Sequence, residues 1–124
     1  MRRGLLYLAL LSFASMPARA EVINSDQAAD YIGGTETVCG TVASVTFLAS
    51  LIGFPTFLDI GGTYPNQDLL VFIWGNQRQG VGQKVGRPQS LAGHRVCVTG
   101  SISAWHGRPQ MFLQDASQIE KPKD

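Results

Sequence analysis

The chain has 124 residues, 44% of them hydrophobic and 15% charged, which is enough for one small domain and too short for two. Its formal net charge is +1, but three of the ten bases lie within the first twenty residues. Residues 21–124 therefore carry seven bases against nine acids, and a net charge of −2 excludes a global polycation built for nucleic acid.

The first twenty residues have the order of a secretory signal peptide. A basic start over residues 1–4 precedes an apolar run over residues 5–14, and Ala18-Arg19-Ala20 forms an A-x-A cleavage pattern. The apolar run is too short to span a bilayer, and it lacks the polar residues at helical spacing that a buried helix would need. The sequence predicts cleavage after Ala20 and a periplasmic or secreted protein with no membrane segment once the signal is removed.

A short helix is predicted at the start of the mature chain, over Gln27–Ile32. Ser25-Asp26 can cap its first turn and Gly33-Gly34 can end it. Its apolar side would consist of Ala28, Ala29 and Ile32.

Five strands are predicted after this helix from β-branched residues, alternation and turn residues. They are Glu36–Phe47, Thr56–Ile60, Leu69–Trp74, Arg95–Trp105 and a last strand that includes Gln110–Leu113. One face of the first strand would carry Val38, Gly40 and Val42, and the other Cys39, Thr41 and Ala43. The fourth strand would similarly place Val96, Val98, Gly100 and Ile102 on one side. Gly40 and Gly100 lie inside strands, where glycine usually marks a bulge or bend that would help a small sheet curl shut.

Residues 75–93 are predicted to form a long connector, because they contain five glycines and little apolar periodicity. Gly80–Gly86 has the spacing G-x-G-x-x-x-G, and Arg87-Pro88 prevents a helix from following it directly. A dinucleotide-binding loop is therefore excluded, and a flexible loop is predicted.

Acids and bases are segregated along the mature chain. Glu21–Asp68 holds six acids and no Lys or Arg, whereas Leu69–Gln114 holds five bases, two histidines and no acid. The five bases are Arg78, Lys84, Arg87, Arg95 and Arg108. Either the fold brings them onto one polyanion-binding surface, or solvated loops have collected them, and the sequence leaves both interpretations open.

Six blocks of the mature sequence form a recognisable series. They are Thr37-Val38-Cys39-Gly40-Thr41-Val42, Pro55-Thr56-Phe57-Leu58-Asp59-Ile60-Gly61, Tyr64-Pro65-Asn66-Gln67, Ile73-Trp74-Gly75, Val96-Cys97-Val98-Thr99-Gly100-Ser101-Ile102 and Gly107-Arg108-Pro109-Gln110. In this order they resemble small secreted bacterial OB-fold proteins, related to the anticodon-binding and single-strand-binding OB domains, over about Ser25–Ile119. With the strand count, the resemblance predicts an all-β fold: a five-stranded Greek-key OB barrel with a short N-terminal helix, in a single domain over 21–124 with a core over about 36–115.

A disulfide between Cys39 and Cys97 is predicted. These are the two cysteines of the mature chain, and the signal peptide directs them to an oxidising compartment. Both should point to the outer side of the barrel, on first and fourth strands that an OB barrel makes antiparallel neighbours. Two separate small thiols are the alternative.

Aromatic and basic residues supply the candidate binding surface. In OB folds the face of the second and third strands binds oligonucleotides or oligosaccharides, with bases stacked on rings and phosphates on cations. The aromatic and imidazole rings on or beside the second, third and fourth strands are Phe57, Tyr64, Phe72, Trp74, Trp105 and His106. Alternation of Leu70, Phe72 and Trp74 could place these residues in the core, whereas Tyr64, Trp105 and His106 lie at turns and are expected to be exposed. The strongest candidate for a binding site is the turn Trp105-His106-Gly107-Arg108, because it combines an aromatic ring, an imidazole and a cation at an exposed position. The predicted ligand-binding residues are Tyr64, Trp74, Arg78, Lys84, Arg87, Trp105, His106 and Arg108.

The function predicted from these features is weak, non-catalytic binding of single-stranded nucleic acid or another polyanion. A periplasmic scaffold for a protein or small ligand is the alternative. A third reading is a thermonuclease-like enzyme, in which Asp59 and Asp68 would hold a metal beside an arginine such as Arg108. The thermonuclease motif residues do not match, so Asp59 is interpreted as a solvated strand residue and Asp68 as a turn acid.

No cofactor or metal is expected. Zinc needs paired ligands at short spacing, whereas His94 and Cys97 lie three apart on a strand and face opposite ways. Cys39 and His106 are remote from this pair in sequence.

Overall fold

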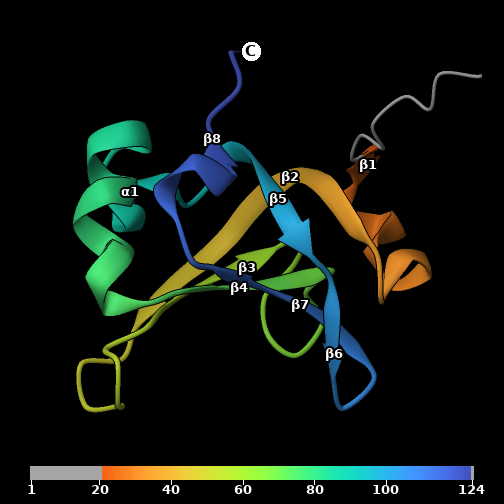
Figure 1. Ribbon diagram of the computed structural model, residues 1–124, viewed down its shortest axis with the longest axis horizontal. Coiled ribbons are helices and arrows are strands. Elements are labelled where there is room, and N and C mark those ends of the chain that lie inside the picture. The colour runs from red at the N-terminus through yellow and green to blue at the C-terminus, as the bar shows by residue number, and fades with distance from the viewer. Residues whose placement is uncertain (1–20, 124) are drawn as a thin grey trace, which may run out of the picture.

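Eight strands and one α-helix organise residues 21–123, the part of the chain that the computed structural model describes (Figure 1). The strands are β1 (Val22–Asn24), β2 (Thr35–Phe47), β3 (Thr56–Ile60), β4 (Leu69–Ile73), β5 (Arg95–Ser101), β6 (Ser103–Trp105), β7 (Arg108–Leu113) and β8 (Ile119–Glu120). The helix α1 is Arg78–Val85, and 3₁₀ segments occupy Ser25–Tyr31, Gly75–Gln77, Pro88–Leu91 and Ala116–Gln118. The predicted signal peptide lies outside the described residues.

The strands form one curled, mixed sheet in the order β6-β7-β4-β3-β2-β5-β8, with β1 beside β2 (Figure 1). The pairs β4–β7 and β1–β2 are parallel, and the others are antiparallel. Only Ile102 separates β5 from β6, although four strands lie between them in the sheet order, so the sheet must bend back toward itself. This mostly β, OB-like arrangement agrees with the predicted all-β class, but the structure has eight strands instead of the predicted five. The fourth predicted strand, Arg95–Trp105, is divided into β5 and β6, and the short strands β1 and β8 are additional.

Alternate side chains of the central strands fill the interior of the curled sheet. The valines predicted to face inward on β2 and β5, and Ile102 after them, are almost completely buried. On β4 the buried residues are Leu69, Val71 and Ile73. Because successive residues of a strand point to opposite faces, Leu70 and Phe72 face outward and are half-buried, which decides the question that the sequence left open.

Gly40 is required because side chains from two other segments lie close to it, and not because the strand bulges there. A Cβ added at Gly40 would lie 2.7 Å from Ile60 Cγ2 and 2.7 Å from Ser25 Oγ. The irregularity in β2 occurs further along, between Val42 and Ser44, where the register with β3 shifts. The prediction of a bend at this strand was therefore right in kind, but it was placed at the wrong residue.

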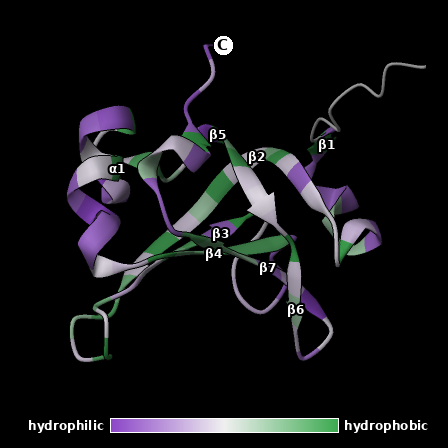
Figure 2. Ribbon diagram, viewed as in Figure 1, coloured by the Kyte–Doolittle hydropathy of each residue, from purple (hydrophilic) through white to green (hydrophobic). Residues whose placement is uncertain are grey.

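The predicted connector over residues 75–93 is wrong, because it contains α1 and two of the 3₁₀ segments. Val81 and Val85 are one helical turn apart and buried, and they anchor α1 against the rest of the fold. The remaining helix residues are polar or glycine, and Figure 2 shows α1 as largely hydrophilic. Two apolar residues in an eight-residue helix give too little periodicity to be recognised in the sequence.

The predicted helix over Gln27–Ile32 is a 3₁₀ segment over Ser25–Tyr31. Its N-terminal cap is Asn24, whose backbone N–H donates to the Gln27 side chain, so the predicted cap at Ser25-Asp26 is displaced. Ala28 is buried as expected, whereas Ala29 and Ile32 are exposed. Among the described residues, no helix has the length and apolar character needed to cross a membrane.

The Cys39–Cys97 disulfide is confirmed. The two residues are directly opposed on antiparallel β2 and β5, with their Cα atoms 4.0 Å apart. Both alternate with inward-facing valines, which directs the disulfide away from the interior as predicted. Cys39 is nevertheless buried, and β1 and β8 flank the pair on either side.

Candidate ligand-binding groove

The outward face of β3, β4 and β7 carries a row of three phenylalanines. Phe57, Phe72 and Phe112 are cross-strand neighbours in register. The Phe72 and Phe112 rings are stacked with centroids 4.8 Å apart, and the Phe57 ring meets Phe72 edge-on at 4.6 Å. These geometries are the favourable ones for aromatic pairs, so the row forms a fixed apolar floor.

A second row lies beside the phenylalanines and is more polar. Asp59, Leu70 and Gln110 are cross-strand neighbours on the same three strands. Asp59 is 7% exposed, and its carboxylate accepts a hydrogen bond of 2.6 Å from Ser44 Oγ on β2. The interpretation of Asp59 as a solvated strand residue is therefore wrong, because its side chain is buried and hydrogen-bonded.

Two turns flank the outward face that carries these two rows. Tyr64, in the turn between β3 and β4, is 65% exposed, and Trp105, at the end of β6, is 54% exposed. Together with Thr46 and the two rows, they line a groove of about 620 Å³, which we call the aromatic groove. The prediction that Tyr64 and Trp105 are exposed at turns is confirmed.

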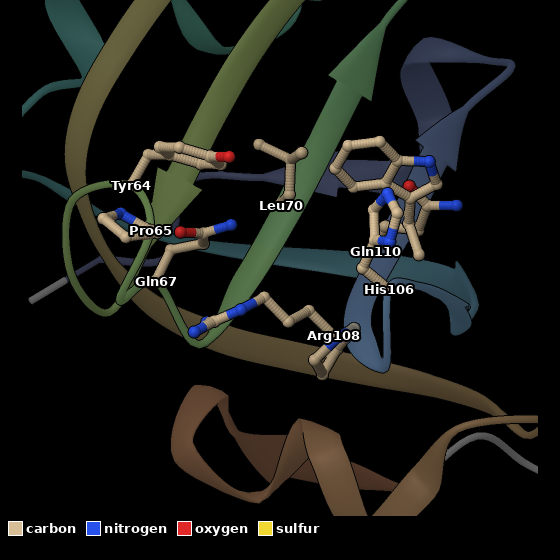
Figure 3. Close-up of a pocket in the computed structure, with 9 residues that line it drawn as sticks. Tyr64, Pro65, Gln67, Leu70, His106, Arg108 and Gln110 are labelled. Carbon is tan, nitrogen blue, oxygen red and sulfur yellow. The ribbon is translucent and has the colours of Figure 1, made fainter.

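A smaller pocket of about 230 Å³ adjoins the aromatic groove between the two turns, and we call it the hairpin pocket (Figure 3). Its lining consists of Tyr64, Pro65, Gln67, Leu70, Trp105, His106, Arg108, Pro109 and Gln110. Figure 3 shows Tyr64, Pro65 and Gln67 on one side of Leu70 and His106 and Gln110 on the other. The His106 ring packs edge-on against Trp105, with centroids 4.0 Å apart.

Four of the eight predicted site residues are brought together here, namely Tyr64, Trp105, His106 and Arg108. Arg78 instead donates a 3.2 Å hydrogen bond to Thr56 Oγ1 and lies 4.3 Å from the centre of the Phe47 ring. Arg87 lines a separate hollow beside α1, and Lys84 donates to the Ser117 carbonyl. In Figure 1, α1 lies at the opposite end of the molecule from the β6–β7 turn.

The predicted convergence of bases is therefore not found. Of the five bases between residues 69 and 114, Arg108 lines the hairpin pocket, while Arg95 borders a different hollow near Gly40. Trp74 lies beyond the groove lining, with its ring parallel to Phe112 at 5.9 Å. It extends the aromatic floor rather than forming a wall.

The sequence places Phe57 and Phe72 on the strands of the expected binding face without assigning them to the site, and it does not indicate Phe112, Gln110 or Gln67 as site residues. Phe112 and Gln110 come from a strand whose parallel pairing with β4 has no local signal in the sequence. Gln67 is buried within a turn segment whose neighbours are exposed, so composition gave no indication of its role.

The aromatic groove offers planar apolar surface, the Asp59 carboxylate and the Gln110 amide, and the adjoining hairpin pocket adds the Arg108 cation and the Gln67 amide. This chemistry suits binding. Within residues 21–123 no group of three or more His, Cys, Asp and Glu could hold a metal ion. Asp68, the other acid of the nuclease reading, accepts a 2.8 Å hydrogen bond from Ser25 Oγ and lies outside the groove lining. Away from the groove, hydrogen bonds from the Ser117 side chain and backbone lower the pKa of Asp115, which caps the 3₁₀ segment 116–118.

Comparison with solved structures gives a match over 90% of this chain, with a TM-score of 0.52 and 9% sequence identity. The matched chain is assigned as an aspartyl-tRNA synthetase from Leishmania major Friedlin, and the match spans 22% of its length. At this identity the match supports a common OB-like fold. No protein-family description and no curated protein matches the sequence.

Proposed function

We propose that the protein is a non-catalytic binding module whose aromatic groove holds a short stretch of single-stranded nucleic acid. The observation that carries the proposal is the row of stacked phenylalanines between Tyr64 and Trp105, next to Arg108. Stacking of bases on aromatic rings contributes about 1–3 kcal/mol per base and tolerates any base, because every base has a π-face.

The charge distribution makes this binding weak. One arginine lines the groove region, and the mature chain carries an excess of acids. We therefore expect a dissociation constant on the order of micromolar or poorer, with a salt dependence that corresponds to about one or two phosphates.

Two comparisons support the choice of ligand. The structural match lies in a tRNA synthetase, an enzyme that handles RNA, and six sequence blocks resemble secreted bacterial OB-fold proteins. We infer from the same likeness that β2, β3, β4, β5 and β7 are the five strands of a Greek-key OB barrel. We infer from the signal-like N-terminus that the protein is directed to the periplasm or outside the cell. Incubation with DNA and Ca²⁺ or Mg²⁺ is expected to leave the DNA uncut.

Trp105→Ala is expected to weaken binding of a labelled thymidine octamer by about 1–3 kcal/mol, because it removes one wall of the groove. Fluorescence anisotropy of the labelled octamer measures this effect without relying on the tryptophan itself. Ile52→Ala is the matched control, since Ile52 is 97% exposed and lies outside the groove lining. Equal affinities of W105A and I52A would contradict the placement of the ligand.

Arg108→Ala is expected to reduce the slope of log K against log salt by about 1, because it removes one phosphate contact. The measurement is an octamer titration at several salt concentrations. Arg87→Ala removes an equal charge from the hollow beside α1 and should leave the slope unchanged. The same loss of slope in both variants would mean that the bases act only through net charge.

A scaffold for a protein partner is the second candidate, and the loop between β2 and β3 favours it. Leu51, Ile52 and Phe54 are exposed apolar side chains in this loop, and Phe47 precedes it on β2. Single exposed apolar residues are common, whereas a cluster of them is typical of interaction sites. This candidate becomes the leading one if no single-stranded DNA or RNA binds at low salt.

A further inference from the structure

Gln67 is a buried carboxamide that the protein itself does not use. The side chain is 6% exposed, and its Oε1 is the one buried side-chain N or O atom without a hydrogen-bond partner in residues 21–123. Nor does any hydrogen bond within that range involve its Nε2. A buried amide oxygen without a hydrogen-bond partner is unfavourable, so its presence needs an explanation.

The backbone around Gln67 is fixed by hydrogen bonds on both sides. The Asn66 N–H donates to the Thr63 carbonyl at 2.7 Å, and the Asp68 N–H donates to the Ile60 carbonyl at 2.8 Å. Gly62 has a φ of 155°, and a Cβ there would lie 2.8 Å from the Asn66 carbonyl oxygen. The turn therefore fixes the backbone position from which the Gln67 side chain extends.

The carboxamide of Gln67 borders the hairpin pocket. Figure 3 shows it beside Tyr64 and Pro65, with the Arg108 side chain running from the hairpin toward it. The remaining lining is mainly flat and apolar, with Leu70, Trp105 and Pro109 around the pocket. A volume of about 230 Å³ lies below the ~300–1,000 Å³ of pockets for drug-sized ligands, so it suits one planar ring system.

We infer that the hairpin pocket receives one unstacked base of the bound strand and that Gln67 selects this base through its polar edge. The inference rests on the proposed function and names the specificity-determining residue of that site. A carboxamide presents a donor beside an acceptor, and adenine presents the complementary pair at N6 and N7. Among the bases that present a donor beside an acceptor, we assign adenine, because its two fused rings offer the larger flat surface to Leu70 and Trp105, with its phosphate near Arg108.

The test compares three octamers that differ in one central base. The first is all thymidine, the second carries one adenine, and the third carries a purine without the exocyclic amino group at the same place. The wild-type protein should bind the adenine octamer about 5-fold or more tightly than the amino-free one, since a bidentate pair discriminates by about 1–3 kcal/mol. In Gln67→Met, a variant of the same side-chain length, this ratio should fall to about 1, while the all-thymidine octamer still binds within about 3-fold of wild type.

Two controls separate recognition from folding. Gln83→Met changes an exposed glutamine on α1 and should preserve the ratio. The melting temperature of Q67M should equal or exceed that of the wild type, because the substitution removes an amide without a partner. Gln67→Leu serves the same purpose if Q67M is poorly folded.

The outcomes distinguish this inference from the proposed function. If Q67M and the wild type bind all octamers and show the same ratio of affinities for the adenine and the amino-free octamer, Gln67 does not select the base, and the groove proposal stands. If the wild type binds none of the octamers at low salt, both proposals are overturned.

Discussion

Replacing both disulfide cysteines with alanine is expected to lower the free energy of unfolding by about 4 kcal/mol. The Cys39–Cys97 bond joins residues 58 apart in sequence, and a loop of this length loses that amount of closure entropy in the unfolded chain on the chain-entropy model. For a domain of this size, the melting temperature should fall by on the order of 20 °C. Urea denaturation of C39A/C97A and of the wild type, monitored by circular dichroism, measures the difference.

Two comparisons make the disulfide result specific. The wild type in excess reductant should match C39A/C97A, because both lack the cross-link. Affinity for the octamer should change little below the melting temperature, since the disulfide joins β2 to β5 whereas the groove floor is on β3, β4 and β7. A stability loss under about 1 kcal/mol would mean that the unfolded chain is already restricted without the bond.

Gly40→Ala is expected to destabilise the protein by about 2–3 kcal/mol, the second-largest effect among these predictions. The new Cβ would lie within 2.8 Å of three atoms that belong to Ser25 and Ile60. Both neighbours are buried, so neither can move away without disturbing the core. The measurement is again urea denaturation. The m-values of G40A and the wild type should be equal, because a changed m-value would indicate an effect on the unfolded state.

Gly82→Ala is the matched control for this substitution. Gly82 lies in α1, and a Cβ there would meet nothing within 4 Å. Alanine is the better helix former by about 1 kcal/mol, so G82A should be slightly more stable than the wild type. Destabilisation of both variants to a similar degree would contradict a steric cause at Gly40. Partial rescue of G40A by Ser25→Gly would identify Ser25 as the colliding group.

The sequence predicts the large strands because their signals are local. Thr56–Ile60 coincides with β3, and the inward valines of β2 and β5 follow a period of two. The disulfide could be predicted because the sequence has just two cysteines and the strands that carry them are neighbours in the resembled family. The helix α1 escaped prediction because its apolar side is only Val81 and Val85, with glycines between and beside them.

The edges of the candidate site could be predicted from the sequence, whereas its phenylalanine floor could be predicted only in part. Tyr64 and Trp105 carry turn signals of their own, so the sequence identifies them as exposed. Phe57, Phe72 and Phe112 become a surface only through the pairing of β3, β4 and β7, which joins Phe57 to Phe72 and Phe72 to Phe112 across long sequence separations. The sequence likewise cannot show that Arg78, Lys84 and Arg87 lie far from the groove. Their positions depend on the distance between α1 and the β6–β7 turn, which the tertiary fold sets.

The β6–β7 turn differs from the groove floor in how firmly it is held, and this bears on the range of ligands. β6 is three residues long and ends the sheet order with β7 as its one neighbour, whereas β3 and β4 each pair on both sides. Strands with fewer hydrogen-bonded neighbours open at lower local free energy. We therefore expect Trp105 to shift relative to the better-held strands of the groove floor. Ligands of different thickness can then bind without repacking of the core. Amide hydrogens of Ser103–Trp105 should accordingly exchange faster than those of β3 and slow down when the octamer binds.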